Sequence, residues 1–183
     1  DDLERYEGML VTFPQTLYIA EYYNFDRFGE IVLTSPSPFQ PATARQFQPT
    51  AVYGPSTPEA EQLAQSNILG RITLDDGRST QDPDPAIHPN GNVFDLTNLF
   101  RGGDMVENVT GVMDDTFGLY RIQPTQGADY MEANPRTEYP DDVDGDLKVA
   151  SFNVLNYFTT LDLGTDICGP SEDMECRGAD SEE

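Results

Sequence analysis

The sequence RYEGMLVTFPQTLYIAEYYNFDRFGEIVL, residues 5–33, indicates the fold class of this chain. Apolar and polar residues alternate along it in three runs, which is the pattern of strands that bury one face. The apolar members of these runs are Tyr6, Met9, Val11 and Phe13, then Leu17, Ile19, Tyr22, Tyr23 and Phe25, then Ile31 and Leu33. Pro14-Gln15 and Asp26-Arg27 separate the runs and favour turns. The stretch therefore predicts three antiparallel strands in a meander.

The residues that follow predict one helix and further strands. Thr57 can cap a helix that starts at Pro58 and ends at Gly70. Short strands are predicted at residues 71–74, 109–113 and 118–124, and the connections between them are long and rich in Pro and Gly. Five or six strands with one helix favour a mainly β fold, an OB-fold-like small closed barrel. We assign residues 1–124 to this domain.

A second element begins after a polar, acidic linker at residues 125–146. From Leu147 onwards both faces of the next run are apolar, as in a strand buried within a layered sheet. One strand cannot form a domain by itself. Residues 147–183 are therefore interpreted as the start of a second, incomplete domain.

The charge balance limits the functions open to the chain. Asp and Glu number 33 against 10 Lys and Arg, a net charge of −23. So acidic a domain repels a phosphate backbone at long range and gains little from counterion release. The composition thus argues against an independent DNA-binding module. Solubility in a salty or calcium-rich medium is the simplest explanation, because salt screens the repulsion.

Cys168 and Cys176 lie close together in a polar segment. Such a pair predicts a disulfide that closes a small loop, which would indicate an oxidising compartment; two separate thiols are the alternative. A zinc site is disfavoured because the chain has one His, His88, far from the cysteines. A lone His in a Pro-rich loop is expected at the surface.

The sequence contains no run of about 20 apolar residues, so no membrane span is predicted. Residues 1–4 have neither the basic start nor the apolar run of a signal peptide. If the protein is secreted, we expect its signal to have been removed or to lie upstream.

Residues 148–158, KVASFNVLNYF, resemble the opening strand of the endonuclease/exonuclease/phosphatase superfamily, the fold of pancreatic-type deoxyribonucleases. The segments CGPS (168–171) and CRGADS (176–181) resemble the stretch after that strand in large secreted bacterial nucleases. In those proteins an OB-like domain precedes the nuclease domain. Residues 6–11, 111–114 and 118–124 look like parts of that accessory domain.

The resemblance implies that the second domain is a truncated α/β four-layer sandwich. Its chemistry would be hydrolysis of phosphodiester bonds in extracellular DNA or RNA with Mg²⁺ or Mn²⁺. Of the family's site residues only Asn153 maps onto this chain, where its amide would assist at the metal or phosphate; an amide cannot act as a base. The metal-binding Glu and the catalytic His of the family would follow Glu183. We therefore expect this chain alone to be inactive and its barrel to pack on its own C-terminal nuclease domain. A phosphatase of the same fold stays open.

Asp142, Asp144 and Asp146 place a carboxylate at every second residue, as at the start of a calcium loop. No Glu follows at the spacing that a complete loop requires, so a solvated acidic linker is the competing interpretation. This motif supports the alternative function, a non-catalytic, calcium-bound binding or adhesion module of a secreted protein.

An aromatic group surrounds Arg27 and consists of Tyr22, Tyr23, Phe25 and Phe28. OB-folds bind single strands through stacking aromatic side chains and nearby Arg. The group is therefore a candidate nucleic-acid or domain-docking surface. Core packing is the competing explanation, because alternate side chains of a barrel strand point inward.

Overall fold

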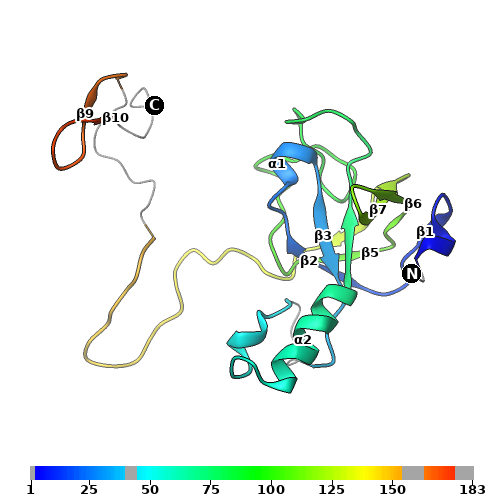
Figure 1. Cartoon of the computed structure of the whole chain (residues 1–183), viewed down its shortest axis with the longest axis horizontal. Coiled ribbons are helices and arrows are strands. Elements are labelled where there is room, and N and C mark those ends of the chain that lie inside the picture. Colours follow the sequence, from blue (N-terminus) through cyan, green and yellow to red (C-terminus); the bar gives the residue numbers. More distant parts are fainter. Residues whose placement is uncertain (1–2, 40–44, 154–162, 176–183) are drawn as a thin grey trace. The chain divides into compact units, whose positions relative to one another are not determined.

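A computed structural model of the chain describes residues 3–39, 45–153 and 163–175 (Figure 1). The chain divides into two compact units, Asp1–Thr137 and Glu138–Glu183. No helix within the described ranges is both long enough and apolar enough to cross a membrane.

The first unit is built on one eight-stranded sheet with the order β1-β6-β7-β4-β3-β2-β5-β8 (Figure 1). Neighbouring strands are antiparallel except β4 and β7, which are parallel. The sheet curls into a half-barrel, so the predicted mainly β class is confirmed. The strands are β1 (Leu10–Thr12), β2 (Leu17–Glu21), β3 (Ile31–Thr34), β4 (Arg71–Leu74), β5 (Met105–Glu107), β6 (Thr110–Thr116), β7 (Leu119–Pro124) and β8 (Asp129–Met131).

The half-barrel is open, whereas the sequence favoured a closed barrel. Its edges are β1 and β8, which do not pair with each other. The predicted meander is also wrong, because β1 pairs with β6 through Leu10↔Val112 and not with β2. Alternation of apolar residues marks a strand but does not identify its partner, which depends on contacts distant in sequence.

Two helices flank β3. Helix α2 (Pro58–Leu69) forms as predicted: the Thr57 hydroxyl accepts a hydrogen bond from the Ala60 amide at 3.3 Å, and Gly70 ends the helix. Helix α1 (Phe25–Phe28) replaces the end of a predicted strand. Gly29 adopts a left-handed φ of 71° after it, the backbone geometry of a helix C-terminus. Short 3₁₀ turns lie at Glu4–Tyr6 and Pro49–Ala51.

Strand β8 lies within the stretch that the sequence analysis assigned to the linker, and it joins the sheet on β5. In the second unit β9 (Asp166–Cys168) and β10 (Met174–Glu175) form a small antiparallel pair. The strand expected from Leu147 does not form over residues 147–153, and residues 154–158 lie outside the described residues. Leu147, Val149 and Phe152 are 80–86% exposed, so they lack the sheet partner that a strand needs.

The core of the first unit contains His88, contrary to the expectation of a surface residue. Its side chain is 1% exposed and stands edge-on to Tyr130, with ring centroids 4.5 Å apart. Nδ1 accepts a hydrogen bond from the Asn90 amide at 3.0 Å, and Nε2 lies 3.2 Å from the Leu99 carbonyl oxygen. Because Nδ1 accepts, the proton of a neutral ring is on Nε2 and is donated to Leu99. Burial lowers the pKa of His88 below 6.5, although the Leu99 carbonyl, the Asn90 side chain and the charge of Asp104 oppose this shift.

We predict a pH-dependent contribution of His88 to stability. The unfolded chain binds the imidazole proton more readily than the folded chain, so this contribution is complete above about pH 6.5 and declines as the pH falls. The destabilisation caused by His88→Gln should therefore be larger at neutral pH than at acidic pH. Urea unfolding of both proteins measures it. An NMR titration of the one His should give a pKa below 6.5, and a value at or above 6.5 would contradict the prediction.

We also predict that Gly29→Ala is more damaging than Gly118→Ala. Both glycines have a left-handed φ, 71° and 73°, so each Ala costs about 1 kcal/mol in backbone strain. Only at Gly29 would the added Cβ lie 2.4 Å from Cγ of Asp76, whereas at Gly118 it meets nothing within 4 Å. We expect a total loss of about 3 kcal/mol at Gly29 in urea unfolding. Equal losses for the two variants would refute the contact.

Candidate functional site

The structure separates the predicted aromatic group into core and surface members. Phe25 is buried and packs edge-on against Phe94 and Phe100. Tyr22 is 49% exposed and Tyr23 86% exposed. The Arg27 guanidinium lies over the Phe28 ring, 5.1 Å from its centroid. Core packing thus accounts for Phe25, while the two tyrosines remain available at the surface.

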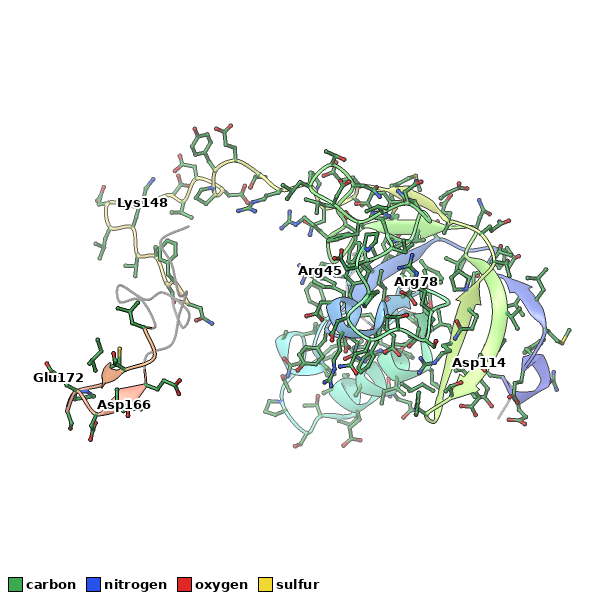
Figure 2. The ribbon with its side chains drawn as sticks, turned by 90° about the horizontal axis from the view of Figure 1, so that it is seen from above. Arg45, Arg78, Asp114, Lys148, Asp166 and Glu172 are labelled. Carbon is green, nitrogen blue, oxygen red and sulfur yellow. The ribbon has the colours of Figure 1, made fainter. Side chains whose placement is uncertain are left out.

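The two tyrosines line a hollow of about 530 Å³ together with Phe25, Arg45 and Gly102. Arg45 also lines a second hollow of about 540 Å³, with Phe47, Gly103 and Asn134 among its walls. Arg45, labelled in Figure 2, therefore stands between two depressions of the first unit. This placement brings a guanidinium-bearing side chain next to exposed aromatic rings.

The Gly102-Gly103 dipeptide makes this arrangement possible. Gly103 has a φ of 95°, and a Cβ there would lie 2.9 Å from Cγ of Arg45. A Cβ on Gly102 would lie 3.6 Å from Cε1 of Tyr22. The backbone of the two glycines is thus the surface on which the aliphatic stem of Arg45 and the edge of Tyr22 rest.

Asp104 holds the loop of Gly102-Gly103 in place. Its side chain is fully buried and accepts hydrogen bonds from the Arg101 amide at 2.7 Å, the Tyr130 hydroxyl at 2.6 Å, and the Ala133 and Asn134 amides, both at 2.9 Å. Burial opposes the charge of Asp104, but these four hydrogen bonds outweigh it and lower the pKa of the carboxyl. Asp104 is thus an internal anchor and not part of the exposed surface.

A second arginine is brought to the same place by this loop. Nη1 of Arg101 donates to the Asn134 carbonyl at 2.9 Å, and Asn134 also borders Gly103. We call Tyr22, Tyr23, Arg45 and Arg101 the arginine–tyrosine surface. The sequence analysis named the two tyrosines but neither Arg45 nor Arg101, because both arginines are distant from Tyr22 in the sequence.

The acidic residues around this surface are partly neutralised. Glu21 forms a salt bridge with Arg71, and Asp104 is fully buried with its carboxylate hydrogen-bonded. Asp26 lines the hollow of the two tyrosines and is exposed. The surface therefore combines two cations and two aromatic rings with two exposed carboxylates, of which Glu21 is paired with Arg71 and Asp26 lies in the same hollow.

The residues predicted in the second unit are not brought together. Asp142, Asp144 and Asp146 are exposed, and Asp142 instead pairs with Lys148 at 2.8 Å. Among the described residues no three or more His, Cys, Asp or Glu side chains are placed to hold a metal ion. The calcium site stays a prediction. Asn153 is exposed and lies outside any strand.

The predicted disulfide also stays a prediction. Cys168 ends β9, while Cys176 lies outside the described residues.

Comparisons of the chain with protein-family models, with curated proteins and with solved structures found no match. A function for this chain therefore rests on the arginine–tyrosine surface and on the sequence resemblance.

Proposed function

We propose that this chain is the front part of a secreted, metal-dependent nuclease. Residues 1–137 would form an accessory half-barrel, and the second unit would begin the catalytic domain. The observation that carries this proposal is the arginine–tyrosine surface, because guanidinium groups beside exposed rings suit a phosphate backbone and its bases. The resemblance of residues 148–158 to a nuclease strand supports the same conclusion.

The exposed apolar side chains of the second unit agree with this organisation. Leu147, Val149 and Phe152 are largely exposed within the described residues of this chain. In the proposed parent enzyme they would be covered by the remaining strands of a layered sheet. The accessory unit would then pack on its own C-terminal nuclease domain and extend the substrate groove.

Asn153 would contribute to phosphodiester hydrolysis through its amide. The divalent ion, Mg²⁺ or Mn²⁺, would supply charge stabilisation at the phosphate. The Asn153 side chain would hold the ion or the phosphate by its carbonyl oxygen or its NH₂ group, and it would transfer no proton. The groups that activate water would come from residues after Glu183.

We expect residues 1–183 alone not to cleave plasmid DNA with Mg²⁺, and the protein extended by the sequence encoded after Glu183 to cleave it. In the extended protein, Asn153→Ala should lower kcat about 100-fold, because an amide donor or ligand at the transition state is lost. Glu138→Gln, an exposed change in the linker, is the matched control. Cleavage by residues 1–183, or an inactive extended protein, would overturn the nuclease proposal.

We expect the arginine–tyrosine surface to bind a single strand weakly at low salt. Fluorescence anisotropy with a labelled oligothymidine of about 12 nucleotides measures this in about 20 mM salt. Tyr23→Ala should weaken binding about tenfold through lost stacking. Arg45→Ala should weaken it and reduce the slope of log affinity against log salt by about 0.7.

The control for the arginine is Arg5→Ala, which removes the same charge from a residue over the Tyr6 ring at the N-terminal 3₁₀ turn. If this variant weakens binding as much as Arg45→Ala, the effect is one of net charge and the surface is not a binding site. Tyr23 is so exposed that its removal should leave the unfolding midpoint unchanged.

A further inference from the structure

A cavity of about 320 Å³ lies within the first unit and shares no lining residue with the two hollows at Arg45. Its apolar lining consists of side chains from the sheet and the loops: Ile31, Leu74, Ile87, Val109 and Ala128. A volume of about 300 Å³ is at the lower end of the range for small-molecule sites. The cavity can therefore hold a small ligand with an apolar body.

Two loops close to each other form one wall of the cavity. The Ala128 amide donates to the Pro89 carbonyl at 2.9 Å, and a Cβ on Gly127 would lie 2.1 Å from the Asn90 carbonyl oxygen. Neither Gly91 nor Gly127 has a side chain that could fill the space, although both line it. The backbone contact holds this wall in position before any ligand arrives.

Two acidic residues line the cavity, and they differ in their partners. Asp75 is satisfied, because it pairs with Arg121 at 3.0 Å and accepts from the Gly77 amide at 3.0 Å. Asp76 accepts from the Arg78 amide at 2.9 Å through Oδ1, while its Oδ2 is shielded from water and has no hydrogen-bond partner among the described groups. Burial raises the pKa of Asp76, and the nearby charge of Asp75 adds to this shift. The hydrogen bond from the Arg78 amide and the charge of the Arg78 side chain oppose it. Asp76 is thus the carboxyl that would gain from a new partner.

The sign of that partner follows from the surrounding charges. Arg78, labelled in Figure 2, also lines the cavity, but its Nη1 is already engaged, donating to the Pro85 carbonyl at 2.9 Å. A carboxylate ligand would meet Asp75 and Asp76 in a chain of net charge −23. The same field attracts a cation. An ammonium group also donates hydrogen bonds that a carboxylate oxygen can accept.

We propose that this cavity binds a small organic cation, a primary amine on an apolar ring, and that the Asp76 carboxylate turns from Gly29 towards the cavity to pair with the ammonium group. The ring would lie on Ile31, Leu74 and Ile87. This site is independent of the proposed nuclease function, since it involves neither the arginine–tyrosine surface nor the second unit.

Titration of the chain with benzylamine, followed by NMR, tests the proposal. The His88 ring lines the cavity and is the one imidazole in the chain, so its signals and the amide signals of Gly91 and Gly127 report occupancy. We expect a Kd of about 1 mM, as for a ligand of this size. Benzyl alcohol and benzoate have the same ring without the positive charge, and each should bind at least about tenfold more weakly.

Asp76→Asn should weaken benzylamine about tenfold and leave benzyl alcohol unchanged, because only the ion pair is lost. Asp115→Asn is the matched control, since Asp115 is exposed on β6 and does not line the cavity. If Asp76→Asn does not fold, the affinities of the unmodified chain for benzylamine, benzyl alcohol and benzoate still test the proposal. Absence of shifts with benzylamine, equal binding of benzoate, or insensitivity of a folded Asp76→Asn variant would each overturn the proposal.

Discussion

The salt bridges of Arg121 with Glu30 and Asp75 are the interaction on which the first unit depends. Nη1 of Arg121 lies 2.6 Å from Glu30 and 3.0 Å from Asp75, and all three side chains are largely buried. They join β7 to the residue before β3 and the residue after β4. Removing one partner of such a buried group leaves a charge without compensation, at a cost of about 3–5 kcal/mol. The parallel pairing of β4 with β7, through Leu74↔Ile122, is therefore fixed by charge as well as by the core.

This constraint also separates the roles of two adjacent acids. Asp75 forms a buried salt bridge with Arg121 and accepts a hydrogen bond from the Gly77 amide. Asp76 packs against Gly29 and lines the cavity. Of the two acids that line the cavity, Asp75 is thus engaged by Arg121, and Asp76 forms no salt bridge among the described residues.

The net charge and the arginine–tyrosine surface act over different distances. A charge of −23 acts over roughly 10 Å at 0.1 M salt, beyond which ions screen it. The proposed contacts of Arg45 and Tyr23 with a nucleic-acid strand would act within a few ångströms, through hydrogen bonds and stacking. Overall repulsion and local binding would therefore be compatible, and their balance would be a low affinity with a strong dependence on salt. This combination suits an accessory unit that adds contacts to a strand held by a neighbouring domain.

The local sequence was sufficient to predict the helix and those strands whose positions depend on neighbouring residues. Thr57, Pro58 and Gly70 mark the ends of α2, and alternation located β4, β6 and β7, because caps and periodicity depend on residues only a few positions apart. Long-range packing decided the rest: the pairing of β1 with β6, the open edge, the burial of His88 and the meeting of Tyr22 and Arg45. Of the aromatic group named from the sequence, Tyr22 and Tyr23 belong to the candidate site and Phe25 to the core. Which side chains meet depends on how strands distant in sequence pair and bury one another, and no short stretch of sequence contains that information.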